Sequence, residues 1–148
     1  MKNDIKTFSI NGIGNINVSA TMRGVCNGTK QFDGKHYIYN LKIWSEKGKM
    51  SVTFHDSRWN YEDGIKKMDE VSLVSAMDCV ISDISMYLDD SIRYCYDENE
   101  DAALIKSVTN GCKKEYEKFA AVVGGEDNVR GAIEELAEQI GECYNNFD

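Results

Sequence analysis

Histidine is the side chain most often used for proton transfer near neutral pH, and this sequence contains only two, His36 and His55. His55 begins the run His55-Asp56-Ser57, which holds the three residue types of a hydrolase triad. Adjacent residues at a strand end point in different directions and cannot form a chain of nucleophile, base and orienting acid. We therefore interpret the run as a strand end followed by a turn.

Asp97, Asn99 and Asp101 have the one, three, five spacing of the ligands in a calcium-binding loop. The sixth position of such a loop requires glycine and the twelfth a bidentate glutamate, but these positions hold Ala102 and Val108. An acidic helix start is the better interpretation, because carboxylates near a helix N-terminus interact favourably with its dipole.

The five cysteines are Cys26, Cys79, Cys95, Cys112 and Cys143, an odd number with no C-x-x-C pair. A structural zinc site would need ligands from scattered elements, so we expect buried free thiols that act as small hydrophobic side chains in a reducing cytosol. The sequence predicts no catalytic residue, no metal site and no cofactor, and we expect a protein that is not an enzyme.

The first hairpin is predicted around Asn11-Gly12, which favours a type I′ turn because both residues tolerate positive φ. Phe8 and Ile10 precede this turn. Apolar residues then alternate with polar ones from Ile16 to Met22, the period of a strand with one buried face.

A second hairpin is predicted where Ser45-Glu46-Lys47-Gly48 joins two alternating runs, residues 37–43 and 50–54. The alternation places Tyr39 in the core and Trp44 on the opposite face beside Lys42. The two hairpins predict a four-stranded antiparallel sheet.

After Asp69 the hydrophobic period changes to that of helices, and three are predicted. The first has an apolar stripe from Leu73 to Leu88, with Asp69 or Ser72 as its cap. Ile105, Val108, Cys112, Tyr116, Phe119 and Val123 form the second stripe, which ends at Gly124-Gly125. The third helix is expected from Asp127 to Ile140, with Gly141 as its C-terminal stop. Strands followed by helices predict one α+β domain over residues 1–148, with the helices on one face of the sheet.

Charge divides the chain into two halves. Residues 1–68 hold 11 basic and 6 acidic side chains, a balance of +5, whereas residues 69–148 hold 6 basic and 19 acidic ones, a balance of −13. Lysines and aromatic residues interleave in the basic half, a mixture that can stack single-stranded bases and hold their phosphates. The candidate nucleic-acid residues are Lys42, Trp44, Lys47, Lys49, Arg58 and Trp59.

The acidic half predicts rows of carboxylates that face solvent, including those of Asp83 and Glu115, because most acidic residues lie off the apolar stripes. Such a surface can imitate the phosphate array of DNA and bind the basic cleft of a nucleic-acid enzyme. The candidate protein-binding residues are Asp89, Asp90, Glu98, Glu100, Asp101, Glu134, Glu135 and Glu138. A simple solvated face is the alternative interpretation.

Localisation is expected to be the host bacterial cytoplasm. Residues 1–6 contain no apolar segment typical of a signal peptide, and no uncharged apolar stretch approaches the ~20 residues of a membrane span.

The block Tyr39-Asn40-Leu41-Lys42-Ile43 and the segment from Lys47 to Ser57 resemble a family of small uncharacterised proteins encoded by phages and mobile elements. Tyr94-Cys95-Tyr96-Asp97 and Lys114-Glu115-Tyr116-Glu117-Lys118 extend the resemblance. The family commonly has a proline at the start of its first helix and a glycine at the position of Cys95; this chain has neither. The resemblance implies a phage or mobile-element origin. By analogy with small acidic inhibitors of host defence, including anti-CRISPR proteins, it favours an inhibitor of a host nuclease complex; a single-stranded nucleic-acid accessory protein and a small enzyme are the alternatives.

Overall fold

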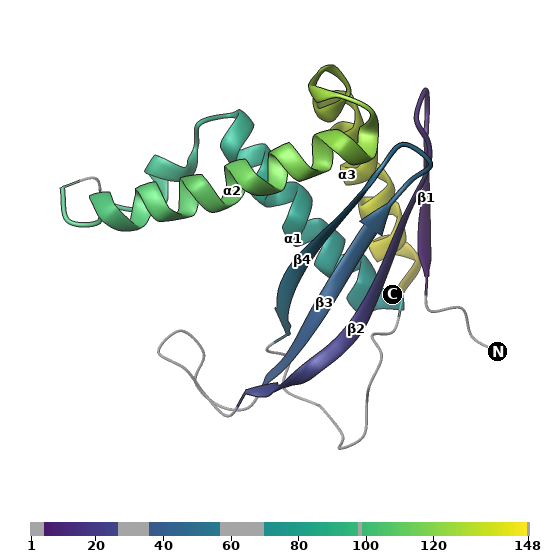
Figure 1. Ribbon diagram of the computed structural model, residues 1–148, viewed down its shortest axis with the longest axis horizontal. Coiled ribbons are helices and arrows are strands. Elements are labelled where there is room, and N and C mark those ends of the chain that lie inside the picture. Colours follow the sequence, from purple (N-terminus) through teal and green to yellow (C-terminus); the bar gives the residue numbers. More distant parts are fainter. Residues whose placement is uncertain (1–4, 27–35, 57–69, 98, 148) are drawn as a thin grey trace.

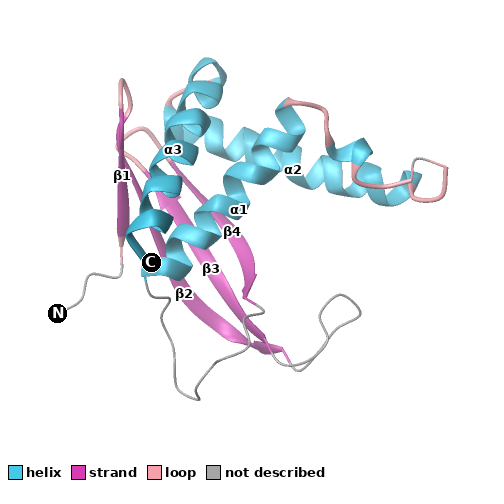
Figure 2. Cartoon of the chain, turned by 180° about the vertical axis from the view of Figure 1, so that it is seen from behind, coloured by secondary structure: helices cyan, strands magenta, loops and turns pink. Residues whose placement is uncertain are grey.

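Four antiparallel strands form one sheet in the order β1-β2-β3-β4, and three helices follow them in the chain (Figures 1 and 2). This computed structural model describes residues 5–26, 36–56, 70–97 and 99–147. The strands are β1 (Lys6–Ile10), β2 (Gly14–Cys26), β3 (His36–Trp44) and β4 (Lys49–Asp56); the helices are α1 (Glu70–Leu88), α2 (Ala102–Val123) and α3 (Val129–Phe147), with short 3₁₀ turns η1 (Ile92–Tyr94) and η2 (Glu126–Asn128). The predicted α+β fold is confirmed.

The turn between β1 and β2 forms a hairpin, but not the predicted type. Ile10 pairs with Gly14, so three residues form the turn, and the Ile13 amide donates to the Ile10 carbonyl at 3.1 Å. Gly12 has a φ of 80°, whereas Asn11 does not have the positive φ that a type I′ turn needs. Positive φ at the third of four turn residues is typical of a type II turn.

The β3–β4 hairpin has the predicted connection, and its turn packs against the end of α2. The Ser45 hydroxyl donates to the Val122 carbonyl at 2.5 Å, and the Ser45 amide donates to the Gly48 carbonyl at 2.9 Å. A Cβ atom at Gly48 would collide with the backbone carbonyl of Ala121. Glycine is therefore required at this point of contact between sheet and helix.

The core lies between the inner face of the sheet and the apolar sides of the helices. Tyr39 is 1% exposed on β3, as its alternation predicts. The described core includes Phe8, Ile10, Ile16, Val18, Leu41, Ile43, Leu73, Met77, Val80, Ile84, Phe119, Val123, Ile133, Leu136 and Ile140. Figure 2 shows α1 and α3 lying across the strands on this face.

Helix α2 buries only its C-terminal half. Its buried residues begin at Cys112, whereas Ile105 and Val108, the first members of the predicted stripe, are only half-buried. Figure 1 shows the N-terminal half of α2 extending past the edge of the sheet. The helix ends at Gly124, as predicted, in a left-handed conformation with φ of 86°.

One predicted helix boundary is wrong, and of the two alternative caps predicted for α1 only Ser72 is excluded. Ser72 is buried inside α1 rather than capping it, and Asp69 lies outside the described residues. Helix α3 continues through Gly141 to Phe147, because Cys143 and Tyr144 pack against the core and the Tyr144 hydroxyl donates to Asp78 at 3.3 Å. These contacts outweigh the roughly 1 kcal/mol that glycine costs inside a helix.

Helix α1 is long and apolar enough to span a membrane by length and composition. It carries the charged residues Asp78 and Asp83, so it is not an uncharged stretch of the kind that the prediction concerned. Its side chains from Leu73 to Ile84 supply much of the core, and a buried core helix meets the same criteria.

Replacing Tyr39 with alanine should lower the free energy of unfolding by about 3 kcal/mol, because truncation of a buried aromatic side chain leaves a cavity. The exposed Ser51 on β4 is the control, and Ser51→Ala should cost less than about 0.5 kcal/mol. Urea unfolding of both variants checks this; equal midpoints would contradict the core position of Tyr39.

Candidate functional site

The exposed side of α3 carries a row of three carboxylates. Glu134, Glu138 and Glu142 follow one another at four-residue intervals, and all are exposed. Residues four apart lie on the same helix face, so the three groups form one line along the helix. We call these three residues the α3 acidic row.

Glu135 is not part of this row, although the sequence grouped it with Glu134 and Glu138. It is half-buried, and its carboxylate accepts a hydrogen bond from the Asn11 amide at 3.3 Å. Gln139, one turn later, donates to the Ser9 carbonyl at 2.7 Å. Glu135 therefore joins α3 to the first hairpin.

The other predicted protein-binding residues divide between two places. Asp89 lies at the end of α1 and accepts from Arg130 of α3 at 3.3 Å, so it borders α3. Asp90 forms an ion pair with Arg93 at 3.5 Å. Glu100 and Asp101 precede α2 at its far end, away from α3, and Glu98 lies outside the described residues (Figure 1).

The acidic start of α2 is organised by Asp97. Its carboxylate accepts from the Asn99 amide at 2.9 Å, and its carbonyl accepts from the Asp101 amide at 2.7 Å. These bonds form a turn before the helix, in agreement with the interpretation of this segment as a helix start.

The helical half is not uniformly acidic. Helix α2 exposes four lysines, Lys106, Lys113, Lys114 and Lys118, whereas residues 126–147 hold six acidic side chains and one basic one. The predicted rows of carboxylates are therefore not found on α2. Acidic side chains instead gather in two segments, residues 89–101 and residues 126–147, which each hold six acidic residues and one basic residue.

The outer face of the sheet is polar and cationic. The charged side chains that the described strands place there are Arg23, Lys42 and Lys49, and no acidic strand residue joins them in the described part of the chain. The Lys42 ammonium lies 5.1 Å from the centre of the Trp44 ring, a cation–π contact. Trp44 is on this face, as predicted.

An open hollow of about 400 Å³ lies beside Trp44. It is lined by Gly14, Asn15, Asn17, Trp44, Ser45 and Glu46. Lys47 points elsewhere, because its methylene groups lie over Gly124 at the end of α2. Arg58 and Trp59 lie outside the described residues. The structure thus brings together Lys42, Trp44 and Lys49 from the predicted set.

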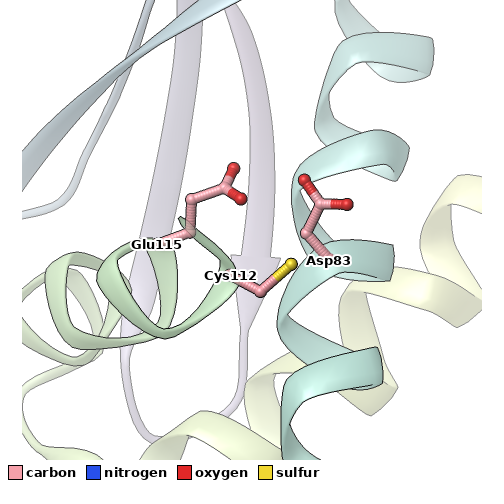
Figure 3. Close-up of side chains that lie close together, drawn as sticks. All are labelled: Asp83, Cys112 and Glu115. Carbon is pink, nitrogen blue, oxygen red and sulfur yellow. The ribbon is translucent and has the colours of Figure 1, made fainter. Parts of the chain in front are cut away.

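A cluster that the sequence did not predict lies between α1 and α2. Asp83 of α1 and Cys112 and Glu115 of α2 place one oxygen or sulfur atom each within 4.8 Å of one another (Figure 3). Cys112 is only 4% exposed, while Asp83 and Glu115 are half-buried rather than facing solvent as expected. The i, i+3 spacing of Cys112 and Glu115 indicates that they lie on the same face of a helix, but nothing in the sequence indicates that Asp83 lies beside them.

Burial favours the neutral forms of all three groups, and nearby carboxylates add to this effect for Cys112 and Glu115. Burial first, and then the hydrogen bond and charge of Asp83, raise the pKa of Glu115 to about 8 despite the opposing charge of Lys118. Burial also raises the pKa of Asp83, and burial together with the two carboxylates raises that of Cys112 to about 11. Glu115 therefore keeps its proton at neutral pH and donates a hydrogen bond to the Asp83 carboxylate.

Cys79 and Cys95 are exposed, which corrects the expectation that the thiols are buried. Cys143 is half-buried, so Cys112 alone fits that expectation fully among the four cysteines whose side chains the structure describes.

Comparisons with known proteins add no relative: no family model, no curated protein and no solved structure matches this chain.

The folded metal-free protein should lose stability as pH rises from about 5 to about 9. Glu115 keeps its proton up to about pH 8 when folded, whereas an ordinary glutamate ionises near 4.5, so the folded state binds more protons in this window. Glu115→Gln should flatten the pH dependence measured by urea unfolding in a chelator-containing buffer.

The matched control is Glu117→Gln, an exposed change on the same helix. It should leave the pH dependence as in the wild type. Equal curves for Glu115→Gln and the wild type would contradict the raised pKa.

Proposed function

We propose that this chain is a non-enzymatic accessory protein of a phage or mobile element that binds a host protein in the bacterial cytoplasm through the α3 acidic row. The partner surface is a groove rich in lysine and arginine, such as the nucleic-acid cleft of a defence nuclease. Inhibition follows because the carboxylates occupy positions that phosphates would take.

The observation that carries this proposal is the row itself. Glu134, Glu138 and Glu142 repel one another at i, i+4 spacing, which costs helix stability, and none has an ion-pair partner among the described residues. Arg130, the basic residue of α3, is engaged by Asp89. The row is thus an exposed line of negative charge without local compensation, complementary to a basic groove.

Reversing the row to Glu134→Lys, Glu138→Lys and Glu142→Lys should weaken partner binding and remove its salt dependence, because the attraction is electrostatic. The probes are purified RNA-guided nuclease complexes immobilised on a sensor, with binding measured over a salt series and in competition with double-stranded DNA. Glu135 is left unchanged because it bonds to Asn11.

A control of equal charge change is Glu46→Lys, Glu100→Lys and Glu117→Lys, three exposed positions outside α3. This variant should retain most of the binding. Equal losses of binding in both triple variants would mean that net charge, rather than the α3 acidic row, determines binding. Binding that neither variant changes would refute the α3 acidic row as the interface.

Single-stranded nucleic-acid binding is the second candidate function, favoured by the hollow beside Trp44. A base can stack on the indole ring while Lys42 and Lys49 hold phosphates, and the hollow gives room for the base. The amide of Asn17 is less available, since its oxygen accepts from Thr7 at 2.7 Å.

Titration with single-stranded DNA at low salt should quench Trp44 fluorescence if this second function holds, and high salt should abolish the effect. Trp44→Ala should cost about 1–3 kcal/mol of binding free energy. Because Trp59 also fluoresces, a Trp59→Phe background isolates the signal. Lys42→Ala should also weaken DNA binding, and Lys114→Ala, which removes a lysine on α2, is its control. Equal losses of binding in these two variants would reject the sheet as the interface. Absence of quenching at low salt would reject it as well.

A further inference from the structure

The cluster of Asp83, Cys112 and Glu115 has the composition of a metal site. Two helices supply three ligand atoms within 4.8 Å of one another, and Figure 3 shows the Cys112 sulfur directed towards Asp83, in the gap between α1 and α2. A tetrahedral zinc ion lies about 2.0–2.3 Å from such ligands, so side-chain rotations that bring these atoms about 1 Å closer together would place all three around one ion.

The cluster lies where α1 and α2 pack against each other. Cys112 is 4% exposed, and its sulfur makes no hydrogen bond to another described residue. Burial raises the pKa of all three groups, and nearby carboxylates add to this effect for Cys112 and Glu115, whereas the hydrogen bond from Glu115 opposes it for Asp83. A bound divalent cation would stabilise the charged forms that burial disfavours. Lys118 is the cation that acts on Glu115, and it does not offset the effect of burial.

We propose that Asp83, Cys112 and Glu115 bind one zinc-like transition-metal ion, with water in the fourth position. A thiolate ligand selects Zn²⁺ or Co²⁺ over Mg²⁺ and Ca²⁺, which prefer oxygen ligands alone. Binding displaces the protons of the thiol and of Glu115 into solvent. The ion joins α1 to α2 at the point where α2 leaves the core, so its effect is to fasten the two helices together.

Cobalt titration of the chelator-treated protein tests the proposal, because a cobalt–thiolate bond gives a charge-transfer band in the near ultraviolet. We expect the band in the wild type, its loss on addition of Zn²⁺, and its absence in Cys112→Ser. Cys95→Ser is the matched control, since Cys95 is exposed and outside the cluster, and it should keep the band. Zn²⁺ should also raise the Tm of the wild type, whereas Mg²⁺ should not.

Asp83→Asn and Glu115→Gln keep the proposal testable if Cys112→Ser does not fold. Each removes a ligand with little change in shape, and each should weaken Zn²⁺ binding by more than about tenfold, while the exposed change Glu117→Gln should not. A cobalt band that persists in Cys112→Ser, or a folded wild type that gives no band with excess Co²⁺, would overturn the proposal. Equal Zn²⁺ affinity in Glu115→Gln and the wild type would do the same.

Discussion

The constraint on which the rest of the structure depends is the single apolar face of the four-stranded sheet. Phe8, Val18, Leu41 and Ile43 all face one side, and that side must be covered because exposed apolar area costs roughly 25 cal/mol per Å². Helices α1 and α3 and the C-terminal half of α2 cover it, which leaves the opposite face open to carry polar and cationic groups (Figures 1 and 2). The division into a polar sheet face and helices with outward charge follows from this one requirement.

Most of the fold was predictable because hydrophobic period reports burial directly. Tyr39 and Leu41 alternate and are buried, and Leu73, Met77 and Val80 recur at helical spacing and are buried. The end of α3 was not predictable from Gly141, since the contacts of Tyr144 that extend the helix come from a distant part of the chain. The turn type at Asn11 was also mispredicted, because the register of the strands places three residues in the turn.

The sequence predicted the chemical character of the candidate sites, but not which residues lie together in them. Counting charges by sequence half treats α2 and α3 alike, whereas Lys113 and Lys118 make the exposed side of α2 basic and Glu138 lies on the strongly acidic α3. Asp83 and Glu115 looked like surface acids because their burial depends on how α1 and α2 cross. Trp44 was placed correctly, since strand alternation alone fixes its face.

The overhanging half of α2 divides the molecule into regions of unequal cooperativity. Residues 102–111 contain no buried side chain, so their backbone hydrogen bonds are supported by little tertiary packing. Isolated helical segments of this length are marginal in water, and amide protons there should exchange through local fraying rather than through global unfolding. From Phe119 onwards the same helix is part of the core, so its amide protons should exchange only when the whole domain opens. One continuous helix thus belongs to two folding units, and their boundary falls near Cys112.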